Sequence, residues 1–309
     1  MDTDTDSHQS GRQTGFRSGF VAIVGAPNVG KSTLLNQLLG EKVAITTPKP
    51  QTTRRQVRGI LTGDNFQVVF VDTPGIHKSN KPLNKILVRW AIKALEDVDA
   101  LIFIVDVTRR RRGQDFAVLD LLRKVGKPVV LVLNKIDKVA KEILLPMIDE
   151  WKDAYPFEAI VPISAKYDNG AYYVLDEILR LLSEGPQFFN GALITDQSRD
   201  DLVAEFIREK IFLLAEQEIP YSTAVNVEEI DDSQEKKIIK ISATIFVERP
   251  SQKGIIIGKN ARFLKKIGIL AREELESLWG KKVYMDLRVK ILKDWSRDDR
   301  SLRRLGLTT

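Results

Sequence analysis

Residues 20–32 read FVAIVGAPNVGKS, and this stretch decides the fold of the first half of the chain. An apolar run at residues 20–24 is followed at once by the pattern G-x-x-x-x-G-K-[ST] at residues 25–32, and helical spacing continues from there. A strand, a glycine-rich turn and a helix in this order form a loop whose backbone N–H groups and helix N-terminus surround a phosphate. The stretch therefore predicts an α/β domain with a phosphate-binding loop.

Further apolar runs continue the pattern outward from this loop. They lie at residues 66–71, 100–105, 129–133 and 160–163. Segments with helical spacing alternate with them, at residues 32–39, 84–95, 115–125 and 172–182. This alternation predicts a doubly wound, mostly parallel sheet. Residues 56–61 have no helix before the next run, so we expect them to form an antiparallel strand at or near the sheet edge.

The pattern changes after residue 182, where Ser-Glu-Gly-Pro opens a loose stretch that runs to residue 199. The second part has α+β order: a helix, two strands, a glycine-punctuated loop, a helical region, a strand and a basic tail. These segments lie at residues 201–215, 223–230, 237–247, 261–279 and 283–292, with the loop before residue 261. We expect a disordered tail at residues 1–18, a nucleotide-binding domain at 19–184, a linker at 185–199 and a second domain at 200–309.

The composition excludes several classes of protein. The 309 residues are 43% hydrophobic and 29% charged, as in soluble globular chains, and the polar N-terminus has no signal-peptide pattern. With no cysteine and only two histidines, disulfides and thiolate or histidine metal sites are excluded, so a metal must take oxygen ligands. Residues 249–309 hold 16 Lys and Arg against 7 Asp and Glu. A cytoplasmic protein with a nucleic-acid or phospholipid partner fits this charge.

Four residues near the phosphate loop have the chemistry for a magnesium-bound triphosphate. Lys31 adds a charge on the β and γ oxygens, and the Ser32 hydroxyl can ligate Mg²⁺. The sequence Asp-Thr-Pro-Gly at residues 72–75 follows a strand, so Asp72 reaches the same sheet edge and can hold Mg²⁺ through water. The Gly75 N–H can then contact the γ-phosphate.

A polar loop at residues 46–55 contains two neighbouring threonines, Thr52 and Thr53. A threonine here can ligate Mg²⁺ only when the γ-phosphate draws the loop in, which is the general design of a nucleotide-sensing switch. We prefer Thr53 as this ligand. Arg54, Arg55 and Arg58 fit a solvated basic strip better than an internal arginine finger.

Residues 134–137, Asn-Lys-Ile-Asp, are expected to determine which nucleotide base the site selects. The Asp137 carboxylate can accept hydrogen bonds from N1–H and the 2-amino group of guanine, which adenine lacks, so the site should select GTP over ATP. Ser164, Ala165 and Lys166 follow the last strand and would complete the base pocket. The predicted GTP-binding residues are Gly25, Ala26, Pro27, Asn28, Val29, Gly30, Lys31, Ser32, Thr33, Asp72, Thr73, Pro74, Gly75, Ile76, Asn134, Lys135, Asp137, Ser164, Ala165 and Lys166; the predicted metal ligands are Ser32, Thr53 and Asp72.

Catalysis lacks one usual group. Ile76 stands where many GTPases place a glutamine that orients the attacking water, and a lone loop histidine such as His77 is more often structural. Asn28 offers another solution, because its amide oxygen can help to bind a monovalent cation that offsets the developing charge. We therefore expect potassium-assisted GTP hydrolysis that is slow without a partner. The predicted catalytic residues are Asn28, Lys31, Thr53 and Gly75.

With these motifs, nearly all of the chain after Gly19 resembles the Era family of bacterial GTPases. The resemblance is carried by residues 27–32, 51–54, 72–77, 247–249, 257–258 and 298–302. It implies a P-loop GTPase domain followed by an α+β KH-type (type II) domain. It also implies binding of ribosomal RNA near the 3′ end of the small-subunit RNA, a role in assembly of the small ribosomal subunit, and coupling to the nucleotide state.

The family's G-x-x-G loop reads Gly258-Lys259-Asn260-Ala261 here, without the second glycine. We expect residue 261 to have helical backbone angles, at which alanine costs little. The isoleucines at 255–257 would form an apolar floor for bases, although they equally fit a buried strand end. The predicted RNA-binding residues are Ile255, Ile256, Ile257, Gly258, Lys259, Asn260, Ala261, Arg262, Lys265 and Lys266.

Two alternatives remain open at this point. The tail at residues 295–305 places Trp295, Leu302 and Leu305 beside four arginines, which fits peripheral contact with the inner face of a membrane by a GTPase switch in cell-cycle signalling. A nucleotide-regulated binding module with negligible turnover is also compatible with Ile76. The arginine run at residues 109–112 fits a solvated loop. We expect a monomer.

Overall fold

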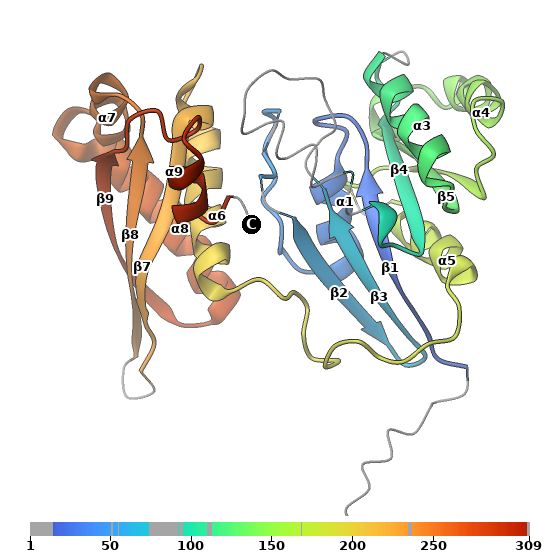
Figure 1. The fold of residues 1–309 in the computed structure, drawn as a ribbon, viewed down its shortest axis with the longest axis horizontal. Coiled ribbons are helices and arrows are strands. Elements are labelled where there is room, and N and C mark those ends of the chain that lie inside the picture. Colours follow the sequence, from blue (N-terminus) through green and yellow to red (C-terminus); the bar gives the residue numbers. More distant parts are fainter. Residues whose placement is uncertain are drawn as a thin grey trace, which may run out of the picture.

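The computed structural model describes residues 15–50, 52–54, 56–73, 92, 95–109, 113–167, 169–233 and 237–307. Two domains lie side by side, each with its own sheet, and an extended segment along one end connects them (Figure 1). The predicted helix at residues 84–95 and residues 74–77 lie largely or wholly outside the described ranges, as do residues 1–14 of the expected tail.

The first domain is built on a six-stranded sheet of order β2-β3-β1-β4-β5-β6. All neighbours pair in parallel except β2 and β3, so the predicted antiparallel edge strand is confirmed. The first strand starts at Arg17, inside the expected tail. The strands are β1 (Arg17–Val24), β2 (Val57–Gly63), β3 (Phe66–Asp72), β4 (Ala100–Asp106), β5 (Val129–Asn134) and β6 (Ala159–Ile163).

Helices cover both faces of this sheet (Figure 1). One core joins the sheet to α1 and α5, and a second joins the opposite face to α3 and α4. Because both faces are covered, the central strands β4 and β5 are almost entirely buried and apolar, and this is why they read as continuous runs. The sequence pattern missed α4. The helices are α1 (Lys31–Leu39), α3 (Gly113–Val125), α4 (Leu144–Lys152) and α5 (Ala171–Leu181).

The connection between the domains is docked on the first domain and is not the loose stretch that we expected. The Ile60 N–H donates to the Ile194 carbonyl at 2.7 Å, and the Thr195 hydroxyl donates to the Arg58 carbonyl at 2.7 Å. The Gln67 side chain accepts from the N–H of Phe188 at 2.8 Å. The first two bonds satisfy backbone groups at the edge of β2, which would otherwise stay unpaired, and the third fixes the connection to a side chain of β3.

The second domain has a three-stranded sheet of order β7-β8-β9, with β7 antiparallel and β9 parallel to β8. Its core joins the sheet to α6 and α8. The predicted α+β order is confirmed. The elements are α6 (Arg199–Leu214), β7 (Thr223–Asp231), β8 (Ile238–Val247), α7 (Pro250–Ile257), α8 (Arg262–Trp279), β9 (Lys282–Ile291) and α9 (Asp299–Arg304).

Helix α7 occupies the place of the expected glycine-punctuated loop, so the isoleucines at 255–257 form neither a loop nor a strand end. Pro250 stands at the first turn, where its missing N–H costs nothing. The Gln252 side chain accepts from the N–H groups of Glu248 and Arg249 at 2.9 and 3.0 Å, which caps the start. Gly258, at φ 70°, ends the helix.

The C-terminal segment folds back onto the second domain. Trp295 and Leu302 are fully buried, Leu305 is nearly so, and the three pack in one cluster with Ala224. The Trp295 indole N–H donates to the Ser222 carbonyl at 3.0 Å. The apolar residues that suggested membrane contact are therefore internal, and that expectation was wrong for this segment. Among the described helices, none is both long and apolar enough to cross a membrane.

Candidate functional site

The carboxyl ends of the parallel strands open into a cavity of about 540 Å³, within the size range of small-molecule sites. Three segments predicted from the sequence meet there: the phosphate loop, the threonine-containing loop and the base-binding loops. The residues that line the cavity are Pro27, Asn28, Gly30, Lys31, Ser32, Thr33, Ile45, Thr46, Thr47, Pro48, Thr52, Thr53, Asn134, Lys135, Asp137, Lys138, Ala165 and Lys166.

The second glycine of the G-x-x-x-x-G-K-[ST] pattern, Gly30, stands where the phosphate loop requires glycine. The backbone there has φ 109°, and a Cβ would lie 2.2 Å from Nδ2 of Asn134. The buried Lys31 ammonium donates to the carbonyls of Gly25 and Ala26 at 3.2 and 3.0 Å. Burial lowers the pKa of Lys31 to about 8, although the Asp72 carboxylate opposes this effect. A phosphate beside this ammonium would stabilise its positive charge and so offset the effect of burial on its pKa.

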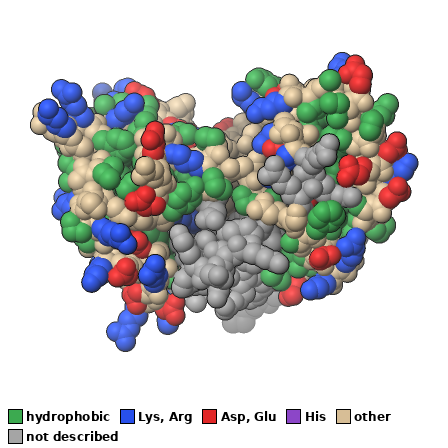
Figure 2. Space-filling view, turned by 90° about the horizontal axis from the view of Figure 1, so that it is seen from above, with side chains coloured by type: hydrophobic (Ala, Val, Ile, Leu, Met, Phe, Trp, Pro, Cys, Tyr) green, Lys and Arg blue, Asp and Glu red, His purple; other side chains and the backbone are tan. Residues whose placement is uncertain are grey.

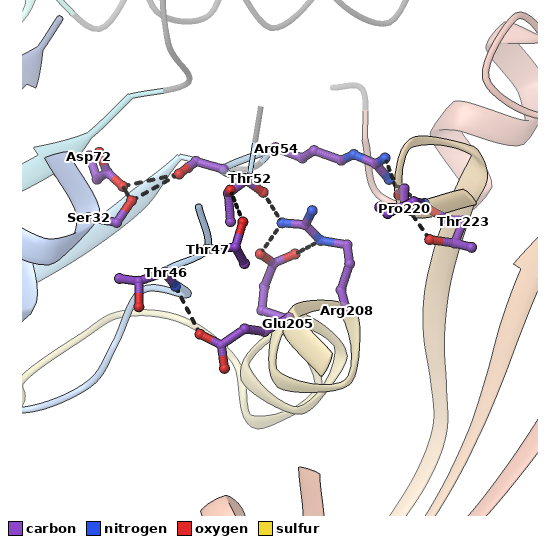
Figure 3. Close-up of polar contacts among 12 residues, drawn as sticks. Ser32, Thr46, Thr47, Thr52, Arg54, Asp72, Glu205, Arg208, Pro220 and Thr223 are labelled. Carbon is purple, nitrogen blue, oxygen red and sulfur yellow. Dashed lines mark hydrogen bonds and ion pairs between the residues drawn. The ribbon is translucent and has the colours of Figure 1, made fainter. Parts of the chain in front are cut away.

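Three oxygen-bearing side chains converge beside the phosphate loop (Figure 3). The Ser32 hydroxyl donates to Oδ2 of Asp72 at 2.6 Å, and the Thr53 Oγ1 lies 3.3 Å from the same oxygen. Burial raises the pKa of Asp72, against the lowering effect of Lys31. The other oxygen of Asp72, Oδ1, is buried and has no hydrogen-bond partner among the residues that the structure describes. A hard cation with oxygen ligands fits this cluster, because it would satisfy that buried oxygen.

Thr52 and Thr53 point in different directions. The Thr52 hydroxyl bonds to the Thr47 hydroxyl at 2.7 Å and to the Lys49 carbonyl at 2.8 Å, inside its own loop. Only Thr53 reaches Ser32 and Asp72. The geometry therefore favours Thr53 as the loop's metal ligand.

On the base-binding side of the cavity, the side-chain amide of Asn134 holds three segments together. Asn134 donates to the Val29 carbonyl at 2.7 Å, and its Oδ1 accepts from the N–H groups of Lys135 and Ala165 at 2.8 and 3.0 Å. This side chain joins the phosphate loop, β5 and the loop after β6. The exposed Asp137 accepts from the Ser164 hydroxyl at 2.5 Å. Its carboxylate thus stands at the pocket mouth, where a guanine edge can replace the serine.

Asp106 belongs to this network, although the sequence analysis did not select it. Its Oδ2 lies 2.6 Å from Nζ of Lys135, and the same ammonium donates to the Asn28 carbonyl at 2.7 Å. The position of Asp106 at the carboxyl end of β4 was the available signal, because the neighbouring strands also end in site residues. Asp106 holds the lysine of the base-binding loop against the phosphate loop.

Asn28 bridges the phosphate loop and the threonine-containing loop. Its Nδ2 donates to the Pro48 carbonyl at 2.8 Å, and its backbone has φ 63°. Asparagine tolerates this left-handed conformation better than most residues. The contact places the side-chain amide next to a backbone carbonyl oxygen of the opposite loop.

The loop between α7 and α8 departs from expectation at Ala261. Its φ is 58° and its ψ is 20°, so residue 261 is left-handed and not helical as we predicted. Asn260 is also left-handed, at φ 52°. Alanine at such a position carries strain that glycine would avoid. Residue 261 therefore has backbone angles that favour glycine, although the chain has alanine there.

The side chains around this loop are basic and exposed. They are Lys259, Arg262, Lys265 and Lys266. Figure 2 shows Lys and Arg side chains spread over the second domain, on the left of the view. Of the three isoleucines, Ile255 is 50% exposed but Ile256 is fully buried in the core, so Ile256 cannot contact bases. The predicted apolar floor was wrong at that residue.

Arg54 is a functional candidate that the sequence analysis placed wrongly. It is 4% exposed, not solvated, and its guanidinium enters the second domain. It donates to the Thr223 and Tyr221 carbonyls at 2.6 and 2.9 Å. Burial lowers the pKa of Arg54 to about 9, with a further lowering from Arg208. No sequence pattern marks this burial, because the partners are backbone oxygens of a distant segment.

Comparisons with known proteins agree with the two domains. The family described as 50S ribosome-binding GTPase matches residues 20–135, and the KH domain family matches residues 218–296. GTPase Era of Syntrophus aciditrophicus is 47% identical over 291 residues, which cover 94% of this chain and 95% of that protein. The chain belongs to the Era family of GTPases. Era of Geobacter metallireducens is 46% identical and covers 95% of this chain and 98% of its own length.

Two Era crystal structures share the whole fold. A variant of Aquifex aeolicus Era bound to GDP and AlF4⁻ has a TM-score of 0.92 and 40% identity, and it covers 95% of this chain and 100% of its own. An Era complex with MgGDPNP and nucleotides 1506–1542 of 16S ribosomal RNA has the same score, identity and coverage. The predicted fold class and the resemblance to the Era family are confirmed.

Proposed function

We propose that this chain is a GTP-hydrolysing switch that binds small-subunit ribosomal RNA near its 3′ end and assists assembly of the small ribosomal subunit. The observation that carries this proposal is the cavity in which the phosphate loop, the Ser32, Thr53 and Asp72 cluster and the Asn134 network meet. The related Era structure with MgGDPNP and 16S ribosomal RNA supports both halves of it.

Mg²⁺ is the metal that the oxygen cluster fits, with Ser32 and Thr53 as hydroxyl ligands and Asp72 acting through water. When bound, it neutralises charge on the β and γ oxygens of the nucleotide. Lys31 adds a second positive charge beside the same phosphate oxygens. Because Ser32 belongs to a helix and Thr53 to a loop, the threonine is the ligand whose position can depend on the γ-phosphate.

Guanine selection rests on Asp137. Its carboxylate is held at the pocket mouth by Ser164, and both of its oxygens can accept from a guanine edge. Adenine would leave this charge unpaired. Phosphate release from GTP and from ATP, each with excess unlabelled competitor, tests the assignment. The proposal expects turnover of GTP that ATP does not inhibit; turnover of both would contradict it.

Potassium is proposed as the cation that assists hydrolysis. The supporting contact joins the Asn28 amide to the Pro48 carbonyl, because rotating the amide would direct two oxygens at one ion. Ile76, which lies outside the described residues, supplies no polar group for the water. Turnover in K⁺ should exceed turnover in Na⁺, and Asn28→Gly, which keeps the left-handed backbone, should remove the difference. Equal rates for both proteins in both salts would refute potassium assistance.

RNA binding rests on the exposed basic loop between α7 and α8. A helix N-terminus with close backbone approach and flanking lysines is the KH means of holding a nucleic-acid backbone. The proposal places Lys259, Arg262, Lys265 and Lys266 on phosphates and Ile255 under a base. Peripheral membrane contact finds no support in the tail, because Trp295 and Leu302 are buried.

A further inference from the structure

Thr52, Thr53 and Arg54 are consecutive residues of the threonine-containing loop. Thr53 contacts the nucleotide site, whereas Thr52 and Arg54 contact the second domain. Thr53 faces the oxygen cluster of the nucleotide site, where its Oγ1 lies 3.1 Å from the Ser32 hydroxyl. Arg54, the next residue, points into the second domain (Figure 3). The carbonyl of Thr52 accepts a hydrogen bond from Nη2 of Arg208 in α6. The metal ligand is therefore flanked on both sides by residues fixed to the other domain.

The Arg54 guanidinium has a site built for it. One nitrogen donates to the Thr223 carbonyl at 2.6 Å, and the other donates to the carbonyls of Pro220 and Tyr221 at 3.2 and 2.9 Å. The rings of Phe212 and Trp295 lie 5.9 and 5.6 Å from its central carbon. A buried charge is tolerated only with such partners, so the loop is held where the guanidinium is held.

Helix α6 holds the rest of the same loop. The Thr46 N–H donates to Oε1 of Glu209 at 2.9 Å. The Lys49 ammonium donates to the Phe212 carbonyl at 2.6 Å and to the Ala215 carbonyl, at the C-terminal end of the helix. A cation at that end is favoured because the last helical carbonyls lack partners. Four residues of the loop from 46 to 54, namely Thr46, Lys49, Thr52 and Arg54, thus bond to the segment that begins with α6.

We propose that Arg54 is a positioning residue through which the second domain sets the position of Thr53 at the Mg²⁺ and γ-phosphate site. This inference rests on the proposed GTPase function and adds the residue that links the two domains. If docking of Arg54 favours the Thr53 position that binds MgGTP, then MgGTP must favour docking by the same free energy. Any effect of the nucleotide on the RNA affinity of the second domain that acts through this docking then passes through Arg54.

The alternative is that Arg54 only holds the two domains together. The two roles differ in what they do to different nucleotides. A structural role would weaken GDP and GTP binding alike through lower stability. A positioning role acts through Thr53, so it weakens only the state that uses Thr53 as a metal ligand. The ratio of GTP-analogue affinity to GDP affinity separates the two roles.

The test compares the full chain with Arg54→Ala, Arg54→Lys and Arg58→Ala. Arg58 is the matched control, because its side chain is 44% exposed and pairs only at the surface with Asp196 among the described residues. Dissociation constants for MgGDPNP and MgGDP are measured, with the Mg²⁺ concentration that gives half-maximal GDPNP binding. Thermal unfolding of each protein with MgGDP reports whether it is folded.

Arg54→Ala should weaken MgGDPNP binding about 10-fold, within the usual range of coupling between sites, and change MgGDP binding less than about 2-fold. Arg54→Lys should resemble it, because an ammonium cannot reach two separate sets of carbonyls in a planar fork. The half-maximal Mg²⁺ concentration should rise in both, and Arg58→Ala should match the unmodified chain. The difference in RNA affinity between the GDPNP and GDP states should shrink in both Arg54 variants and stay unchanged in Arg58→Ala.

If Arg54→Ala leaves the ratio of GDPNP affinity to GDP affinity unchanged, whether both affinities fall equally or neither falls, the positioning role is overturned. If Arg54→Ala does not fold, the same comparison on Arg54→Lys decides. Failure of the unmodified chain to bind either nucleotide would instead contradict the proposed function, so the two failures are distinguishable.

Discussion

The Oγ of Ser32 and the Oγ1 of Thr53 lie 3.1 Å apart, although one belongs to the phosphate-loop helix and the other to a loop that the second domain holds. One cation can contact both oxygens at this spacing. The serine is fixed by α1 whatever nucleotide is bound. The threonine depends on the position of its loop, so the two ligands should respond differently to the γ-phosphate.

We expect Thr53→Ala to weaken MgGDPNP binding by about 10- to 100-fold while leaving MgGDP binding nearly unchanged, because one charge-assisted contact is lost only in the triphosphate state. Ser32→Ala should weaken both. Thr52→Ala is the control, since its hydroxyl bonds within its own loop. Isothermal titration of each variant measures the effect. Equal sensitivity of GDP and GDPNP to Thr53→Ala would contradict its assignment.

Asp137→Asn should change the base that the site selects. Xanthine carries a carbonyl where guanine has its amine, so an asparagine amide can donate to that oxygen and accept from N1–H. GTP affinity should fall about 100-fold or more, because the variant leaves polar groups unpaired. Competition binding with GTP and XTP measures the switch. Retained preference for GTP would show that Asp137 does not read the base.

Acid should weaken the contact between the domains at Glu209. Burial acts to raise the pKa of this carboxyl, but hydrogen bonds from Lys210, Lys42 and the Thr46 N–H outweigh it and hold the pKa below its ordinary value. A lowered pKa means that Glu209 stabilises the fold above its unfolded-state pKa and loses this contribution as pH falls through the folded-state pKa. Glu274 also faces Lys42 and Lys210 and keeps part of the cluster paired.

The expected result is a melting temperature that falls below pH 4.5 more steeply in the unmodified chain than in Glu209→Gln. Thermal scans between pH 3 and 7 measure it. Asp149→Asn is a control, because that carboxylate pairs with Lys152 at the surface. Identical pH profiles for the unmodified chain and Glu209→Gln would show that this carboxylate is not linked to stability.

Ala261→Gly should stabilise the second domain by about 1 kcal/mol, because glycine adopts the left-handed angles of residue 261 without strain. The same change at Ala204, inside α6, should destabilise by a similar amount, since that backbone is helical. Urea unfolding of both variants compares the signs. Destabilisation by both would mean that residue 261 is helical in solution.

The sequence predicted the features that depend on local order along the chain. The phosphate loop, the Asp72 turn and the Asn134 and Asp137 loop each follow an apolar strand, and parallel strands bring their carboxyl ends to one edge. The antiparallel β2 was predictable because no helix separates it from β3. Thr53 was chosen over Thr52 on little local information, and the geometry favours the same residue.

Features that depend on distant partners were not predictable. Arg54 reads as a solvated arginine until the carbonyls of residues 220–223 are brought to it. Trp295 and Leu302 fit an amphipathic surface in the sequence alone, because their packing partners, such as Ala224, lie in a distant segment. Helix α7 was hidden by Gly254 and Gly258, which read as loop residues. Ala261 shows that tertiary structure can impose angles against intrinsic preference.

The affinity for a short RNA oligonucleotide from the 3′ end of small-subunit ribosomal RNA, measured with GDPNP and with GDP at one fixed salt concentration, tests the central claim most directly. If the nucleotide site and the basic loop form one switch, the GDPNP-bound chain should bind this RNA at least about 5-fold more tightly than the GDP-bound chain. Equal affinity in the two states, or no RNA binding in either, would contradict the account.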